Sequence, residues 1–291
     1  MDLSNENTIK ELAKEYRIEP SALKGQNFLV DKKVLNKIVD SAKINSKDNI
    51  LEIGPGFGIL TKQLIKKSKK LIAVEMDEKI VKYLNDTYKD NKKIDIIREN
   101  ILKVSNSEIS KLFNSKDGYR IVSNIPYQIT GKLIKKFVSD TNEDKNDTNI
   151  ISKKPSNIVI LVQKEVAERI CAKKGKMNLL AISVQLYAKP RILFNVSSDS
   201  FWPKPKVDSS LLKIADIKEK PRYRITNIQE FWRVVRIGFS SPRKQLHNNI
   251  ANGLHRDSNE IKDILISIGI PQNARAQELL IEDWIKIIEM I

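Results

Sequence analysis

Short runs of aliphatic residues alternate with amphipathic stretches through roughly the first half of the chain. The aliphatic runs predict strands at Asn49–Ile53, Leu71–Glu75, Ile94–Arg98, Tyr119–Ser123 and Asn157–Val162. The amphipathic stretches predict helices at Leu60–Lys67, Ile80–Tyr88, Glu108–Phe113 and Lys132–Val138. Strands that alternate with helices in this way are typical of a parallel sheet with crossover helices. The expected fold class is therefore α/β.

A polar stretch then interrupts the pattern. Residues 140–154 carry few apolar anchors, so we expect a surface insertion there. Helices are expected at Lys164–Cys171 and Leu179–Ala188, followed by strands at Arg191–Val196 and Ser209–Ile214. We expect these two strands, joined through a rigid turn around Pro203 and Pro205, to form an antiparallel hairpin at the sheet edge.

The last part of the chain shows only helical periodicity. Helices are expected at Ile228–Ile237, Leu246–Asn252, Glu260–Ile268 and Ile281–Ile291. Charged residues and Pro221 interrupt both patterns between Lys218 and Arg224. We therefore expect one α/β domain over residues 1–217 and a small all-helical C-terminal domain over residues 218–291.

A glycine-rich turn follows the first expected strand and precedes a helix. It includes Gly54, Gly56 and Gly58, and position 59 is Ile, so the dinucleotide fingerprint GxGxxG is not met. A turn that lets the backbone approach a ligand, but lacks this phosphate cradle, suits the ribose linkage and amino-acid tail of S-adenosylmethionine. The alternative is a tight turn with only a structural role.

Polar residues stand at the ends of four successive expected strands. After Gly54, the acidic Glu75 closes the second strand, Asn100 follows the third and Asn124 follows the fourth. Ligands of open α/β sheets bind at the carboxyl ends of the strands. Glu75 could accept hydrogen bonds from ribose hydroxyls and Asn100 could bond the adenine of a cofactor, whereas Asp77 suits the cap of the next helix better.

The sequence Asn124-Ile125-Pro126-Tyr127 suits a flat aromatic amine. The lone pair of an exocyclic adenine nitrogen is delocalised into the ring, so acceptors near its hydrogens are needed to make it nucleophilic. The side-chain oxygen of Asn124 and the carbonyl of Ile125 can supply two acceptors, held by the stiff Pro126. Tyr127 offers a ring face for stacking, a contact worth roughly 1–3 kcal/mol per base. The alternative is an ordinary Asn-Pro turn after a strand.

The balance of charge adds a class of partner. The chain has 52 Lys and Arg against 36 Asp and Glu, a formal net charge of +16. Such an excess indicates a polyanionic partner, with nucleic acid the first candidate and an anionic membrane the second. A compositional bias toward lysine is the alternative explanation. We favour a basic cluster of Arg233, Arg236, Arg243 and Lys244 as an RNA contact.

Cysteine and histidine are scarce. One cysteine and two histidines, without a CxxC spacing, offer little material for a metal site, and we expect none. The polar N-terminus lacks the apolar core of a signal sequence, and no run has the length of a membrane span. A cytoplasmic protein without a membrane partner is therefore expected.

Five motifs occur together and in order, and with them the chain resembles the ribosomal RNA adenine N6,N6-dimethyltransferase family, in particular its bacterial small-subunit (16S) branch. The motifs are Gly25-Gln26-Asn27-Phe28-Leu29, the glycine turn, Asn124-Ile125-Pro126-Tyr127, Gln163-Lys164-Glu165-Val166-Ala167 and Phe201-Trp202-Pro203-Lys204-Pro205-Lys206-Val207-Asp208-Ser209. The resemblance implies a Rossmann-like methyltransferase sheet that uses S-adenosylmethionine.

The same resemblance implies the roles of particular residues. It places Asn27, Leu29, Gly54, Gly56, Glu75, Asn100 and Asn124 at the cofactor, and it places Asn124, Ile125, Pro126, Tyr127 and Phe201 at the target base. The family usually has Asp where this chain has Asn100, and weaker cofactor binding is one consequence.

The function implied by the resemblance is dimethylation of two adjacent adenines in small-subunit rRNA, as part of ribosome biogenesis. The partner would be rRNA, within a small-subunit assembly particle, and the enzyme is expected to be a monomer. The alternatives are the macrolide-resistance branch, which acts on large-subunit rRNA, and a non-catalytic RNA-binding factor of the same fold. A DNA adenine methyltransferase is disfavoured by Ile125, and a nicotinamide-dependent oxidoreductase by the missing fingerprint.

Overall fold

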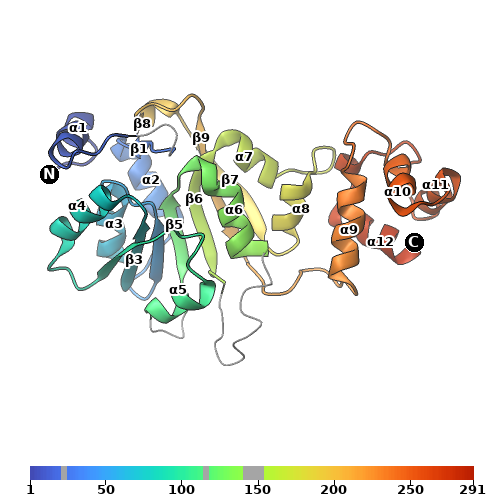
Figure 1. The fold of residues 1–291 in the computed structure, drawn as a ribbon, viewed down its shortest axis with the longest axis horizontal. Helices are drawn as coiled ribbons and strands as arrows, with labels where there is room; N and C mark the ends of the chain where they lie inside the picture. Colours follow the sequence, from blue (N-terminus) through green and yellow to red (C-terminus); the bar gives the residue numbers. More distant parts are fainter. Residues whose placement is uncertain (21–24, 114–117, 140–153) are drawn as a thin grey trace. The chain divides into compact units, whose positions relative to one another are not determined.

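The structure is a computed structural model that describes residues 1–20, 25–113, 118–139 and 154–291. The chain divides into two compact units (Figure 1). The first consists of residues 1–167 and 189–219, and the second of residues 168–188 and 220–291. The first unit contains the strands and the second is helical, so each is described separately.

A seven-stranded sheet forms the centre of the first unit, in the order β4-β3-β2-β5-β6-β9-β7. The neighbours from β4 to β6 pair in parallel, and β9 pairs antiparallel with both β6 and β7. The bounds are β2 Asn49–Ile53, β3 Lys70–Glu75, β4 Ile94–Arg98, β5 Arg120–Asn124, β6 Asn157–Gln163, β7 Lys189–Val196 and β9 Ser209–Ala215. The predicted α/β class, the five strands and the hairpin at the sheet edge are confirmed.

Amphipathic helices follow the parallel strands in the order that the sequence predicts. They are α3 Ile59–Lys67, α4 Glu78–Tyr88, α5 Asn106–Phe113 and α6 Thr130–Ile134, the last continued by a π-helical turn over Lys135–Ser139. The expected polar insertion at 140–154 lies outside the described residues except for its last position. Asp77 caps α4 by accepting a hydrogen bond from the Lys79 amide at 3.1 Å, as expected.

The N-terminal part contains elements that the sequence analysis did not predict. Helix α1 spans Glu6–Glu15 and helix α2 spans Lys32–Ala42. Between them β1 (Phe28–Leu29) pairs antiparallel with β8 (Phe201–Trp202), so the expected turn around Pro203 begins with a strand (Figure 1). This ribbon forms because apolar residues of both segments pack into the core, where Leu29 and Phe201 belong to one cluster with side chains of α2 and α3.

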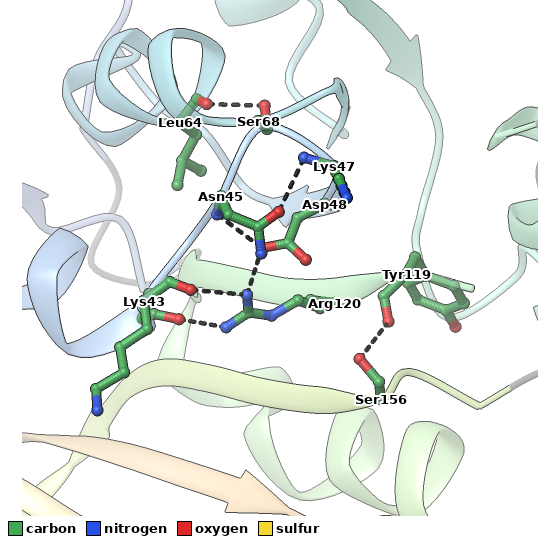
Figure 2. A network of polar contacts seen from close by, with 10 residues as sticks. Lys43, Asn45, Lys47, Asp48, Leu64, Ser68, Tyr119, Arg120 and Ser156 are labelled. Carbon is green, nitrogen blue, oxygen red and sulfur yellow. Dashed lines mark hydrogen bonds and ion pairs between the residues drawn. The ribbon is translucent and has the colours of Figure 1, made fainter. Parts of the chain in front are cut away.

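A buried arginine joins the amino-terminal edge of the sheet to the end of α2 (Figure 2). Arg120 opens β5, and its guanidinium donates to the Asp48 carboxylate at 2.5 Å and to the Lys43 carbonyl at 3.1 Å. A further bond reaches the Ala42 carbonyl. Only 11% of the Arg120 side chain and 18% of the Asp48 side chain are exposed. Arg120 therefore ties the start of β5 to the segment between α2 and β2, more than 70 positions earlier, at the edge opposite to the carboxyl ends of the parallel strands.

The second unit consists of helices only. They are the last part of α7 (Lys164–Ile170), α8 Leu179–Gln185, α9 Ile228–Gly238, α10 Leu246–Leu254, α11 Ser258–Ser267 and α12 Ile281–Met290. Trp284 is fully buried against Gly238, where an added Cβ would lie 2.2 Å from the indole ring. The unit differs from the expected helical domain over 218–291, because it also includes residues 168–188.

In the described residues we find no helix with both the length and the apolar composition of a membrane span.

Candidate active site

A cavity of about 390 Å³ opens at the carboxyl edge of the parallel strands, within the first unit. Its size falls in the range of small-molecule and cofactor sites. The residues that surround it come mainly from the N-terminal segment, the glycine turn after β2, the end of β3, the turn after β4 and the turn after β5. Of the residues singled out in the sequence, the cavity is lined by Asn27, Leu29, Gly54, Gly56, Glu75, Asn100, Asn124, Ile125 and Pro126.

The glycine turn is in close contact with its neighbours on both sides. Gly54 has φ +67°, and an added Cβ would lie 3.2 Å from Cδ of Pro126. Gly56 has φ +55°, and an added Cβ would lie 2.8 Å from Cδ1 of Phe28. Side chains are therefore excluded here both by the left-handed backbone and by the available space. The backbone atoms of the turn therefore form the surface that a ligand would contact.

Glu75 is held rigidly at the end of β3. Its Oε1 accepts hydrogen bonds from the amides of Met76 at 2.8 Å and Asp77 at 3.0 Å. Burial raises the pKa of Glu75, and these amide bonds partly offset that effect. The result is an oriented carboxyl group on the cavity wall, suited to accept hydrogen bonds from hydroxyl groups.

Asn100 lines the cavity from the turn that follows β4. Its Oδ1 accepts a hydrogen bond from the Leu102 amide at 3.0 Å, which closes a turn of the backbone. The Asn100 oxygen, which is the expected acceptor for the adenine amine of the cofactor, therefore already accepts one hydrogen bond. An amide oxygen can accept two, so one more bond is possible.

The orientation of Asn124 is fixed by the N-terminal segment. Its Nδ2 donates to the Asn27 carbonyl at 3.2 Å, and this contact joins residues 97 positions apart. Because the donor end of the amide is engaged by a carbonyl, the oxygen end is available as an acceptor. Asn27 in turn donates from its own Nδ2 to the Gly25 carbonyl at 3.3 Å. The strand ends are also joined by a Ser123 hydroxyl in β5 that accepts from the Ile53 amide of β2 at 3.1 Å.

The two expected base-stacking rings do not line the cavity. Tyr127 follows Pro126 in a short 3-10 helix, Tyr127–Ile129, where its side chain is half-buried. Phe201 differs from the expectation, because its ring is only 3% exposed and packs in the core cluster that contains Leu29. In this structure the Phe201 side chain is part of the hydrophobic core.

Glu52 is a cavity residue that the sequence analysis did not select. It lies in the middle of β2, is 1% exposed and accepts a hydrogen bond from the Thr61 hydroxyl at 2.7 Å. Burial raises the pKa of Glu52 to about 8, and the nearby Glu75 acts in the same direction. An acidic residue flanked by aliphatic residues within a strand was the signal that could have identified it.

We expect the Glu52→Gln variant to gain stability relative to the parent protein as the pH rises. The folded protein keeps a proton on Glu52 up to a pKa of about 8, whereas the unfolded chain releases it near the ordinary value of 4.5. The parent protein therefore loses stability progressively between these two pH values. Glutamine keeps the acceptor for Thr61 and has no proton to lose. Thermal unfolding of both proteins at several pH values from 5 to about 9 measures the difference.

A matched control is Glu11→Gln, because Glu11 lies exposed on α1. Its stability should follow that of the parent protein at every pH. If the stability of Glu52→Gln also changes with pH in parallel with that of the parent protein, the raised pKa of Glu52 is contradicted.

Groups of three or more metal-binding side chains are not found among the described residues of either unit.

The arrangement of sheet and cavity defines a class of enzyme. The residues present fit S-adenosylmethionine, because the turn at Gly54 and Gly56 is cleared for close backbone approach and Glu75 is oriented toward the cavity. The chain is a Rossmann-like, S-adenosylmethionine-dependent methyltransferase.

Comparison with known proteins narrows this class. The profile described as ribosomal RNA adenine dimethylase matches residues 22–291, so the chain belongs to the ribosomal RNA adenine dimethylase family. A ribosomal RNA small subunit methyltransferase A from Dehalococcoides mccartyi is 34% identical over 278 residues, covering 96% of this chain and 90% of that protein.

Two solved structures share the fold. A dimethyladenosine transferase from Plasmodium falciparum is 27% identical with a TM-score of 0.67, covering 89% of this chain and 95% of the other. A 23S rRNA methyltransferase, ErmE, is 19% identical with a TM-score of 0.69, covering 90% of this chain and 98% of the other. At that identity, the second likeness concerns the fold alone.

Proposed function

We propose that this enzyme transfers methyl groups to the N6 amines of two adjacent adenines in small-subunit rRNA. The observation that carries the proposal is the orientation of Asn124, whose Nδ2 is held by the Asn27 carbonyl. Its Oδ1 would then accept a hydrogen bond from the amine of the target base. The relative from Dehalococcoides mccartyi, which is named for the small ribosomal subunit, supports the choice of substrate.

The turn after β5 performs the chemistry by accepting hydrogen bonds. An adenine amine that donates one hydrogen to Asn124 Oδ1 and the other to the Ile125 carbonyl recovers electron density on nitrogen. S-adenosylmethionine supplies an electrophilic methyl group on a sulfonium sulfur. Asn124 and Ile125 need not remove the proton themselves, since the amine becomes acidic once its nitrogen has gained a further carbon. Pro126, packed against Gly54, keeps both acceptors in register with the cofactor cavity.

The cofactor-holding residues in this proposal surround the cavity. Glu75 would accept from the ribose hydroxyls, and the backbone at Gly54 and Gly56 would meet the amino-acid tail. Asn27, Leu29, Asn100 and Asn124 complete the set. Tyr127 would stack on the target base next to Pro126. For Phe201 we propose a supporting position behind Leu29, with which it pairs in the β1–β8 ribbon.

Replacing Gly56 with alanine should weaken cofactor binding at least tenfold, or about 1.4 kcal/mol. The new Cβ would lie 2.8 Å from the Phe28 ring and would strain a residue with φ +55°. Calorimetric titration with S-adenosylmethionine measures the affinity. The control is Gly131→Ala in α6, where an added Cβ meets nothing within 4 Å. Equal affinities for the two variants would show that the space at Gly56 is not required.

The test of the proposed substrate uses both ribosomal subunits. Labelled methyl groups from S-adenosylmethionine are offered to small-subunit particles that lack the modification, and separately to large-subunit rRNA, before nucleoside analysis. Dimethyladenosine in the small-subunit rRNA alone is the expected result. Label in the large-subunit rRNA would assign the enzyme to the macrolide-resistance type, and no label in either would contradict the proposal.

We also propose that the helical unit contributes to RNA binding. Arg236, Arg243 and Lys244 are exposed, whereas Arg233 is paired with Glu230 at 2.7 Å. The net charge of +16 supports a polyanionic partner, which would make binding steeply dependent on salt. We further propose that the natural substrate is an assembly particle in the cytoplasm, because rRNA is modified where ribosomes are assembled. The same proposal includes a monomeric enzyme.

A further inference from the structure

Tyr127 is anchored at its far end by a buried hydroxyl. The distance between its Oη and Oγ of Ser209 is 2.6 Å, and the two residues lie 82 positions apart in sequence. Ser209 is 0% exposed, whereas Tyr127 is half-buried. A hydrogen bond at the tip of a tyrosine ring restricts rotation of the ring about χ1, which otherwise allows alternative rotamers.

The sheet topology explains why this serine reaches the active-site edge. Ser209 is the first residue of β9, and β9 runs antiparallel to β6, with Ser209 opposite Gln163 at the end of that strand. The beginning of β9 therefore lies at the edge where the parallel strands end, and the turn with Tyr127 follows the end of β5 at the same edge. An antiparallel strand thus contributes a side chain to a site otherwise built from parallel strands.

The preceding residue fixes this serine in place. The carbonyl of Asp208 accepts from the Lys164 amide at 3.0 Å, and its carboxylate accepts from the Ser198 amide at 3.0 Å. On its other side, Ser209 pairs with Val196 of β7. The hydroxyl is therefore presented by the start of a strand that is bonded to two neighbouring segments, the beginning of α7 and the end of β7 with the residues after it, which makes it a rigid anchor.

The hydrogen bond persists over the ordinary assay range of pH. Burial raises the pKa of Tyr127 above its usual value of 10.0, and the bond with Ser209 only partly offsets this. Tyr127 stays neutral, and its hydroxyl remains available to Ser209.

We propose that Ser209 is a positioning residue for methyl transfer, which holds the Tyr127 ring in the orientation that receives the target base. This inference rests on the proposed function, in which Tyr127 stacks on adenine. Ser209 itself touches neither the base nor the cofactor in this proposal, and it does not line the cavity. Its effect should therefore appear in the use of RNA and not in the binding of S-adenosylmethionine.

The test compares five variants with the parent protein. Ser209→Ala and Tyr127→Phe each remove one partner of the bond and keep the aromatic ring. Each should lower kcat/KM for RNA about tenfold while the Kd for S-adenosylmethionine stays within about twofold, and the double variant should be no worse than either single one. Tyr127→Phe changes a half-buried position by one atom, so it keeps the test valid if Ser209→Ala folds poorly.

Ser210→Ala is the matched control. Ser210 is the next residue in β9, is equally buried and donates to Asn195 Oδ1 at 2.8 Å, so its loss removes a comparable bond away from Tyr127. It should leave kcat/KM for RNA unchanged. Equal effects of Ser209→Ala and Ser210→Ala, or additive effects in the double variant, would overturn the proposal.

Tyr127→Ala separates the two levels of inference. If this variant transfers methyl groups as well as the parent protein, the proposed stacking role of Tyr127 fails. If it is impaired while Ser209→Ala and Tyr127→Phe behave as the parent protein, the stacking role stands and only the positioning role of Ser209 fails.

Discussion

Replacing Asn124 with alanine is expected to lower the rate of methyl transfer by roughly 10²–10³-fold, the usual effect of removing one preorganised hydrogen-bonding group from a reacting centre. The variant loses the Oδ1 acceptor that would draw electron density to the adenine amine. It keeps the Glu75 carboxyl group and the Gly54 turn, so affinity for S-adenosylmethionine should stay within about tenfold. Single-turnover transfer at saturating cofactor and RNA isolates this step.

Asn124→Asp is the companion variant. It keeps an oxygen acceptor of the same size but replaces the amide donor that binds the Asn27 carbonyl, so the side chain loses its fixed orientation. We expect its rate to fall between those of the parent protein and Asn124→Ala. A parent-like rate in Asn124→Ala would contradict the mechanism, and loss of cofactor binding in both variants would move the role of Asn124 to the cofactor.

Arg120→Ala should destabilise the first unit by about 3–5 kcal/mol, the cost of removing one partner from a buried ion pair. Asp48 would keep a mostly buried charge without its partner, and the carbonyls of Lys43 and Ala42 would lose their donors. Amide hydrogen exchange in β2 and β5 reports the opening free energy of this unit alone. That measurement avoids a single unfolding transition for a chain of two units.

The control for Arg120 is Arg98→Ala. Arg98 makes an ion pair with Glu78 at 2.7 Å, but the two side chains are 57% and 71% exposed. Exposed pairs contribute roughly 0–1 kcal/mol, so this variant should be nearly neutral. Similar losses of stability in Arg98→Ala and Arg120→Ala would show that burial of the Arg120–Asp48 pair does not determine how much that pair contributes to stability.

The strands and most helices could be predicted because their periodicity is strong. Four of the five aliphatic runs are buried at nearly every position, and β2 is buried throughout, whereas β4 at the sheet edge is only partly buried. Helix α2 carried equally clear signals that were not used, since Asp31 caps it and Leu35, Ile38, Val39 and Ala42 form its buried face. Strands of two residues, such as β1 and β8, have too few positions for any periodicity, and only their pairing partner defines them.

The site was predictable where it depends on strand ends, and less so where it depends on distant contacts. Glu75 and Asn124 are the last residues of β3 and β5, so topology alone places them on one edge. The bond between Asn124 and the Asn27 carbonyl, and the burial of Phe201, arise from packing between segments far apart in the chain. A motif that names Phe201 does not show which way its ring faces.

The helical unit is also discontinuous, and this affects how the chain can be divided. The chain passes between the two units at residues 167/168, 188/189 and 219/220. Within the helical unit, the Gln277 carbonyl accepts from the amides of both Gly175 and Met177. A cut near residue 218 would therefore not release a finished module. It would leave the 3-10 helix Ala276–Glu278, which contains Gln277, without its partners and the loop before α8 without its support. Any exchange of the helical unit with that of a relative must carry residues 168–188 as well.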